Sequence, residues 1–183
     1  MNYKNINSNL FKSNFVEKNF SLLVNITILL LIPFLLHEQF LTGILVNAIL
    51  IKSALDFKEK KVYLIAFMPS IAVFASGFML GTLNGALLSM LPFIFAGNLV
   101  LMFGVRKLFV EKKLNYWLAS TISVSVKVLL LGASAFILFS FGQLVPLAFL
   151  TIFGLNQLIT GICGAGLFFA YNSTIKKNAM FKK

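Results

Sequence analysis

Lys127 is the residue whose position most strongly predicts chemistry in this chain. It lies in the middle of an apolar run from Tyr116 to Phe141, and of the 16 Lys and Arg residues only Lys127 and Lys52 fall inside apolar runs. A cation near the centre of a bilayer is costly, and such residues usually serve a solute, ion or proton pathway. Two roles are open for Lys127. It either contacts a bound solute or bonds to polar groups that hold helices together.

Three amide side chains are expected at a depth similar to that of Lys127. Counting about 1.5 Å per residue from the predicted membrane edges brings Asn47, Asn98 and Gln157 close to its level. Each amide alone is typical of a hydrogen bond between helices. Together with Lys127 they predict a polar cluster, provided that all four side chains face the interior of one bundle. Thr160, beside Gly161, belongs to the same candidate set.

His37, Glu38 and Gln39 form a short polar link above Thr42 and Asn47. The first two are the only histidine and the only acidic residue on the predicted outer side, and a lone histidine does not make a metal site. The link is either the mouth of a cavity or a plain solvated turn.

The composition predicts an integral membrane protein. The chain has 183 residues, of which 59% are hydrophobic and 11% charged, whereas soluble domains carry about 25% charged residues. Because a span needs roughly 20 apolar residues, we expect an all-α bundle of six transmembrane helices, at 20–36, 40–55, 62–80, 83–105, 116–139 and 144–171. These spans form one domain, 20–171. A basic tail, 172–183, follows it, and segment 1–19 precedes it as either an interfacial helix or a disordered tail.

The positive charges predict the orientation. The N-terminal segment, the loops after the second and fourth spans and the C-terminal tail hold 3, 3, 4 and 4 Lys or Arg residues, and the other links hold none. By the positive-inside rule both termini are cytoplasmic, in a multi-pass protein of the inner (cytoplasmic) membrane. The net charge of +11 is therefore assigned to loops beside the lipid bilayer, and nucleic acid is excluded as a partner.

The residue inventory argues against an enzyme. Cys163 is the only cysteine, so one chain cannot build an iron–sulfur cluster or a cysteine-ligated zinc site. The sequence also lacks a His-Glu-x-x-His motif, a phosphate-binding glycine loop and a serine near a histidine on plausible spans. We therefore expect no catalytic residues and no cofactor.

Ordered segments resemble a small bacterial membrane family that is loosely labelled "iron hydrogenase" and looks related to the substrate-binding S components of energy-coupling factor transporters. The segments are His37 to Gly43 with Val46-Asn47-Ala48, Pro69-Ser70, Pro92-Phe93 with Gly97-Asn98, the region of Lys127, and Gln157 to Gly161. The resemblance implies a six-helix subunit that captures a vitamin or an ion and works with a transmembrane coupling subunit and ATPases. The single cysteine excludes hydrogenase chemistry in this chain.

The sequence thus favours a membrane-embedded binding subunit for uptake of a small polar solute. The expected binding residues are His37, Glu38, Gln39, Thr42, Asn47, Asn98, Lys127, Gln157 and Thr160. The alternative is a structural or accessory membrane subunit without a ligand, in which Lys127 bonds only to the protein.

Overall fold

A computed structural model describes residues 3–36, 38–57, 60–76, 84–142 and 144–175. Its elements in chain order are α1 Tyr3–Leu35, α2 Gln39–Asp56, α3 Lys60–Ser76, α4 Asn84–Val105, the π-helical η2 Arg106–Glu111, α5 Tyr116–Gly142, α6 Ala148–Thr151, the π-helical η3 Ile152–Asn156 and α7 Gln157–Ile175. The described residues are all-helical apart from short connections, as the apolar runs predict.

Four helical stretches of the described chain are long and apolar enough to cross a membrane. They are Gln39–Asp56, Gly85–Glu111, Tyr116–Phe141 and Ala148–Thr174. The apolar part of α1, Asn19–Leu35, and α3 are each one residue shorter than the shortest of these, at 17 residues. The fold class is therefore an all-α protein that is compatible with embedding in a membrane.

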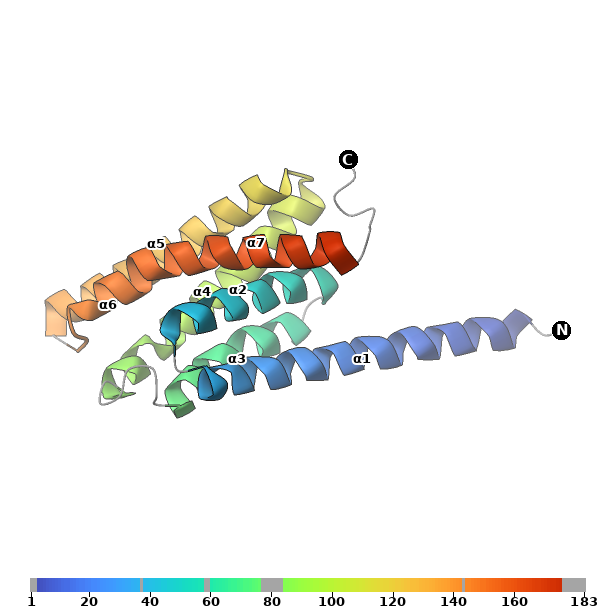
Figure 1. The fold of residues 1–183 in the computed structure, drawn as a ribbon, viewed down its shortest axis with the longest axis horizontal. Coiled ribbons are helices and arrows are strands. Elements are labelled where there is room, and N and C mark those ends of the chain that lie inside the picture. The colour runs from blue at the N-terminus through green and yellow to red at the C-terminus, as the bar shows by residue number, and fades with distance from the viewer. Residues whose placement is uncertain (1–2, 37, 58–59, 77–83, 143, 176–183) are drawn as a thin grey trace.

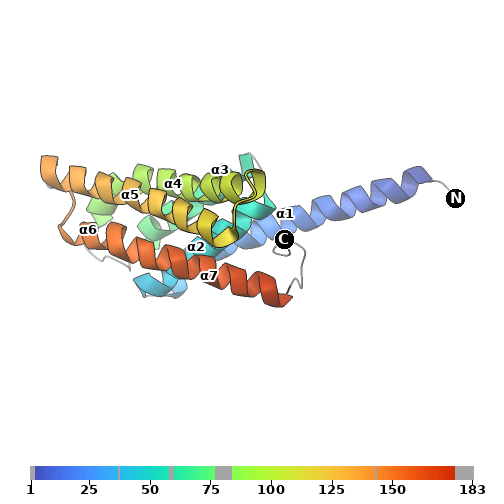
Figure 2. The same cartoon turned by 90° about the horizontal axis from the view of Figure 1, so that it is seen from above.

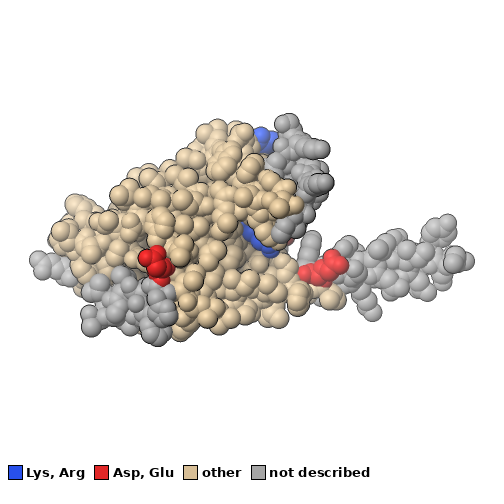
Figure 3. Space-filling model, viewed as in Figure 1, with Lys and Arg blue, Asp and Glu red and all other residues tan. Residues whose placement is uncertain are grey.

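The surface has the polarity of a protein that lies in lipid. Large apolar side chains such as Leu129 and Phe141 are 70% and 87% exposed, while Asn47, Asn98 and Lys127 are buried. Most of the face in Figure 3 carries no Lys, Arg, Asp or Glu among the described residues. An exposed apolar surface of this extent would drive aggregation in water, but it costs nothing against acyl chains.

Helix α1 continues well beyond the rest of the bundle (Figures 1 and 2). It runs without interruption from Tyr3 to Leu35 and contains Pro33 in its last turn. The domain boundary that the sequence suggests at residues 19 and 20 therefore falls inside one continuous helix. The beginning of α1 and the end of α7 lie at the same end of the molecule in both views.

The helices meet most extensively in two pairs, α2 with α7 and α4 with α5. Glycines allow the first pair to approach closely: a Cβ added at Gly164 would lie 2.8 Å from the carbonyl oxygen of Ile44 on α2. A Cβ at Gly161, on the same helix, would lie 2.5 Å from a methyl carbon of Val124 on α5. Small residues thus let α7 pack against both α2 and α5, as is common between membrane helices.

Polar contacts connect several helices near the ends of α2 and α4. The Lys52 ammonium lies 2.9 Å from a carboxylate oxygen of Asp56 and 3.4 Å from the side-chain oxygen of Asn25 on α1. Arg106 donates to the backbone carbonyl of Phe57 at 2.5 Å. Lys52 therefore has partners at the edge of the bundle, in contrast to the deep position of Lys127.

Candidate functional site

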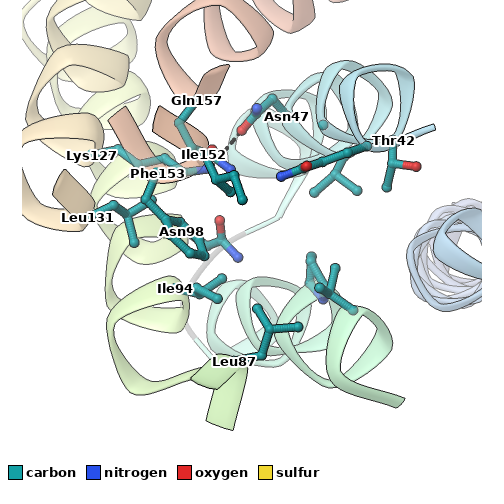
Figure 4. A pocket seen from close by; sticks show the side chains of 15 residues that line it. Thr42, Asn47, Leu87, Ile94, Asn98, Lys127, Leu131, Ile152, Phe153 and Gln157 are labelled. Atoms are coloured by element: carbon teal, nitrogen blue, oxygen red, sulfur yellow. Dashed lines mark hydrogen bonds between the residues drawn. The ribbon is translucent and has the colours of Figure 1, made fainter. Parts of the chain in front are cut away.

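Lys127 reaches the interior of the bundle from the middle of α5. It is the eleventh residue after Tyr116, where α5 begins, which corresponds to about 16 Å along the helix axis. Its side chain is only 4% exposed. The Nζ atom donates to the side-chain oxygen of Asn47 on α2 at 2.8 Å, and Figure 4 shows the two side chains pointing toward each other.

The hydrogen bonds continue from Asn47 to α7. Its side-chain nitrogen lies 3.5 Å from the hydroxyl oxygen of Thr160, and that hydroxyl donates to the backbone carbonyl of Asn156 at 2.8 Å. Hydrogen bonds therefore link Lys127 on α5, Asn47 on α2 and Thr160 on α7 in a chain. In a low-dielectric interior such a chain fixes the positions of its members more strongly than it would in water.

A cavity of about 80 Å³ lies beside this chain. Polar side chains from α2, α4, α5 and α7 line it, namely Gln39, Thr42, Asn47, Asn98, Lys127 and Gln157. The remaining wall is apolar apart from Gly43 and comes mainly from Val46, Pro69, Val73, Leu87, Ile94, Leu131, Ile152 and Phe153. The amides that the sequence places at the depth of Lys127 thus meet around one space.

Asn98 on α4 has a hydrogen-bond partner within the protein, whereas the side-chain oxygen of Gln157 on α7 has none among the described residues. Asn98 donates to the backbone carbonyl of Ala66 at 3.1 Å, three residues before Pro69 in α3. The side-chain oxygen of Gln157 is buried and has no hydrogen-bond partner among the described residues. A buried acceptor without a partner costs about 1–3 kcal/mol, so Gln157 is an available contact for water or a ligand.

The π-helical turn η3 directly precedes Gln157 in the chain. It joins α6 to α7 and ends one residue before Gln157, and its Ile152 and Phe153 line the cavity together with Gln157. A π turn holds one residue more than an α turn because its hydrogen bonds run from i to i+5, and such turns are frequent at functional sites.

The other candidate residues occupy different positions. Thr42 is buried, and its hydroxyl donates to the carbonyl of Leu36 at 3.3 Å. Glu38 is exposed and precedes α2 without forming a side-chain cap. Thr160 is buried but lies behind Asn47 instead of lining the cavity. His37 lies outside the described residues.

The apolar wall is the part of the site that the sequence analysis missed. Its members follow a simple rule, because several lie four residues from a polar lining residue: Ile94 precedes Asn98, Leu131 follows Lys127, and Phe153 precedes Gln157. Residues at this spacing share one face of a helix. Reading that spacing outward from each polar residue would have found them.

The lining suits a small polar or charged molecule that also has an apolar part. Of the described lining residues, Lys127 alone carries a formal charge, and no group of three metal-binding side chains occurs in the described chain. The described lining therefore offers hydrogen bonds and one positive group. Comparison of the chain with family models, curated proteins and solved structures finds no match.

Proposed function

We propose that this protein is a membrane-embedded binding subunit for uptake of a small polar solute. It crosses the inner membrane six times with both termini in the cytoplasm, as the distribution of Lys and Arg predicts. The solute enters from the end at which α2 begins, past Gln39 and Thr42, and reaches Lys127, Asn98 and Gln157.

The observation that carries this proposal is the shared cavity. Side chains from α2, α4, α5 and α7 provide its polar lining, although 80 sequence positions separate Asn47 from Lys127. Bringing a lysine and several amides to one interior space costs desolvation energy. Contacts between helices account for the hydrogen bonds of Asn47 and Thr160, but they leave the Gln157 oxygen without a partner among the described residues.

Coupling to an energy source requires other chains. The sequence contains no nucleotide-binding motif, so ATP-driven transport would need a transmembrane coupling subunit and ATPases on other chains. This arrangement is the one implied by the resemblance to S components, and it remains part of the proposal.

The alternative is an accessory membrane subunit without a ligand. The hydrogen bonds from Lys127 to Asn47 and from Asn47 to Thr160 favour it, because they join three helices without any solute. In this case the cavity is a small void that water fills.

A thermal-shift screen of the purified protein separates the two functions. The panel contains vitamins, nucleobases, small organic acids and metal ions, and each compound is tested on the wild type and on Lys127→Met. A ligand raises the unfolding midpoint by mass action, and we expect the shift to disappear in the variant. A shift that is equal in both proteins would remove Lys127 from the site, and no shift with any compound would favour the accessory function.

A further inference from the structure

The charge balance of the cavity indicates the sign of its solute. The Lys127 ammonium has three N–H donors, and among the described residues only the side-chain oxygen of Asn47 accepts from it. None of the described lining residues is acidic. A buried cation without a counter-charge is destabilised, and the attraction of an anion that binds beside it offsets part of that penalty. This step rests on the proposed function.

One positive charge matches one negative charge. A sulfate or a doubly ionised phosphate would bring two negative charges to a cavity whose described lining supplies a single cation, and the second charge would remain uncompensated in a medium of low dielectric. A metal cation would meet the ammonium and find no carboxylate ligand in the described lining. The electrostatics therefore select a monovalent anion.

The apolar wall indicates that the anion carries an alkyl group. Val73, Leu87, Ile94 and Leu131 line the cavity together with Phe153, and an inorganic anion would leave these surfaces without a favourable contact. The volume of about 80 Å³ corresponds to roughly two or three water molecules, and it is well below the roughly 300 Å³ of the smallest typical drug-sized pockets. The alkyl group is therefore short.

We infer that the cavity binds a short-chain monocarboxylate. Its carboxylate lies against Lys127, and its alkyl tail lies between Ile94, Leu131 and Phe153. The amide of Gln157 has no described partner for its oxygen. Because the oxygen and nitrogen of an amide can exchange places by rotation, Gln157 can turn an N–H toward the second carboxylate oxygen.

The wild-type protein itself provides the first test. Binding of sodium formate, acetate, propionate and butyrate is measured by isothermal titration calorimetry in detergent, together with propionamide as a neutral analogue and sodium sulfate as a divalent anion. Each added methylene is expected to raise the affinity by up to about fourfold until the cavity is full. Propionamide is expected to bind at least about tenfold more weakly than propionate.

Two variants and a control test where the charged group and the alkyl tail of the bound acid lie. Lys127→Met removes the charge at similar length and is expected to lower propionate affinity at least about tenfold. Leu131→Ala enlarges the apolar end and is expected to move the preferred acid to a longer chain. Lys107→Met is the control, since Lys107 is exposed and does not line the cavity, and it is expected to leave binding unchanged.

The outcomes distinguish this inference from the proposed function. If propionamide binds as well as propionate, the inference of a monocarboxylate ligand is wrong, although the cavity still binds a solute. The same holds if sulfate binds more tightly than propionate in a Lys127-dependent manner. If no anion and no compound of the wider screen binds the wild type, both proposals fail. If Lys127→Met does not fold, the wild-type series alone still decides between carboxylate and amide.

Discussion

Replacing Gly164 by alanine would force α2 and α7 apart at the level of the candidate site. The added methyl carbon would lie 2.7 Å from the Cβ of Asn47, 2.8 Å from the carbonyl oxygen of Ile44 and 3.0 Å from the amide nitrogen of Ala48. Favourable contacts between carbon atoms are about 3.5–4.0 Å. Two of the three neighbours are backbone atoms, so no change of rotamer relieves the clash, and the helices must separate by about 1 Å.

The expected change in the free energy of unfolding for Gly164→Ala follows from two opposing effects. Overpacking of a well-packed interior costs about 1–3 kcal/mol, whereas alanine gains roughly 0.8–1 kcal/mol over glycine in helix propensity. We therefore expect a net loss of up to about 2 kcal/mol in the free energy of unfolding, which lowers the midpoint by up to about 8 °C in a chain of this size. Because Asn47 is the nearest neighbour, its hydrogen bond to Lys127 should weaken as well.

The assay is thermal unfolding of the purified protein in detergent, followed by circular dichroism. Gly132→Ala is the matched control, because a Cβ at Gly132 in α5 would meet no atom within 4 Å. The control gains the same helix propensity without a clash and should be as stable as the wild type or more stable. If Gly164→Ala is as stable as this control, the close approach of α2 and α7 is not what limits the packing, and the reasoning is refuted.

Three further experiments test the buried lysine, the peripheral lysine and the topology. Asn47→Leu removes the described acceptor of Lys127 and should lower the free energy of unfolding by about 1–3 kcal/mol. Adding Lys127→Met should recover most of that loss in a double-mutant cycle, whereas additive losses would contradict the pairing. Lys52→Met should cost only about 0.5 kcal/mol in the same unfolding assay, since Lys52 and Asp56 are a partly exposed pair one turn apart, and a loss as large as that of Asn47→Leu would refute this ranking. On intact cells, in a Cys163→Ala background, a membrane-impermeant maleimide should label Glu38→Cys but not Lys112→Cys, and the reverse pattern would overturn the predicted orientation.

The depth of the polar side chains could be predicted because an α-helix rises by a constant distance per residue. Counting from the ends of the apolar runs brought Asn98, Lys127 and Gln157 to one level, and the structure has all three lining the same cavity. Depth alone does not give the direction of a side chain around the helix axis. Thr160, three residues after Gln157, was expected in the site, but it does not line the cavity and its hydroxyl contacts Asn47.

Other features depend on contacts that are distant in the sequence. Apolar composition alone does not separate the cavity wall from lipid-facing residues, because in a membrane helix both are apolar. Leu131 is buried in the cavity wall and Leu129 is 70% exposed, although they are two residues apart on α5. The continuous α1 was also not predicted, since the polar composition of 1–19 suggested a boundary. The six-span count and the cytoplasmic termini stay predictions.

The π turn η3 fixes how the helical segment before it is rotated relative to α7, which follows it. Each residue of an α-helix turns the chain by about 100°, so the extra residue held in a π turn rotates everything before it relative to everything after it. Gly154 lies inside this turn, and a Cβ there would meet no atom within 4 Å. Deleting Gly154 would convert the turn to α geometry. Phe153 would then rotate about the helix axis, while α7 would keep its packing against α2. A change of one residue in the length of η3 would therefore rotate the part of the cavity wall that Ile152 and Phe153 form.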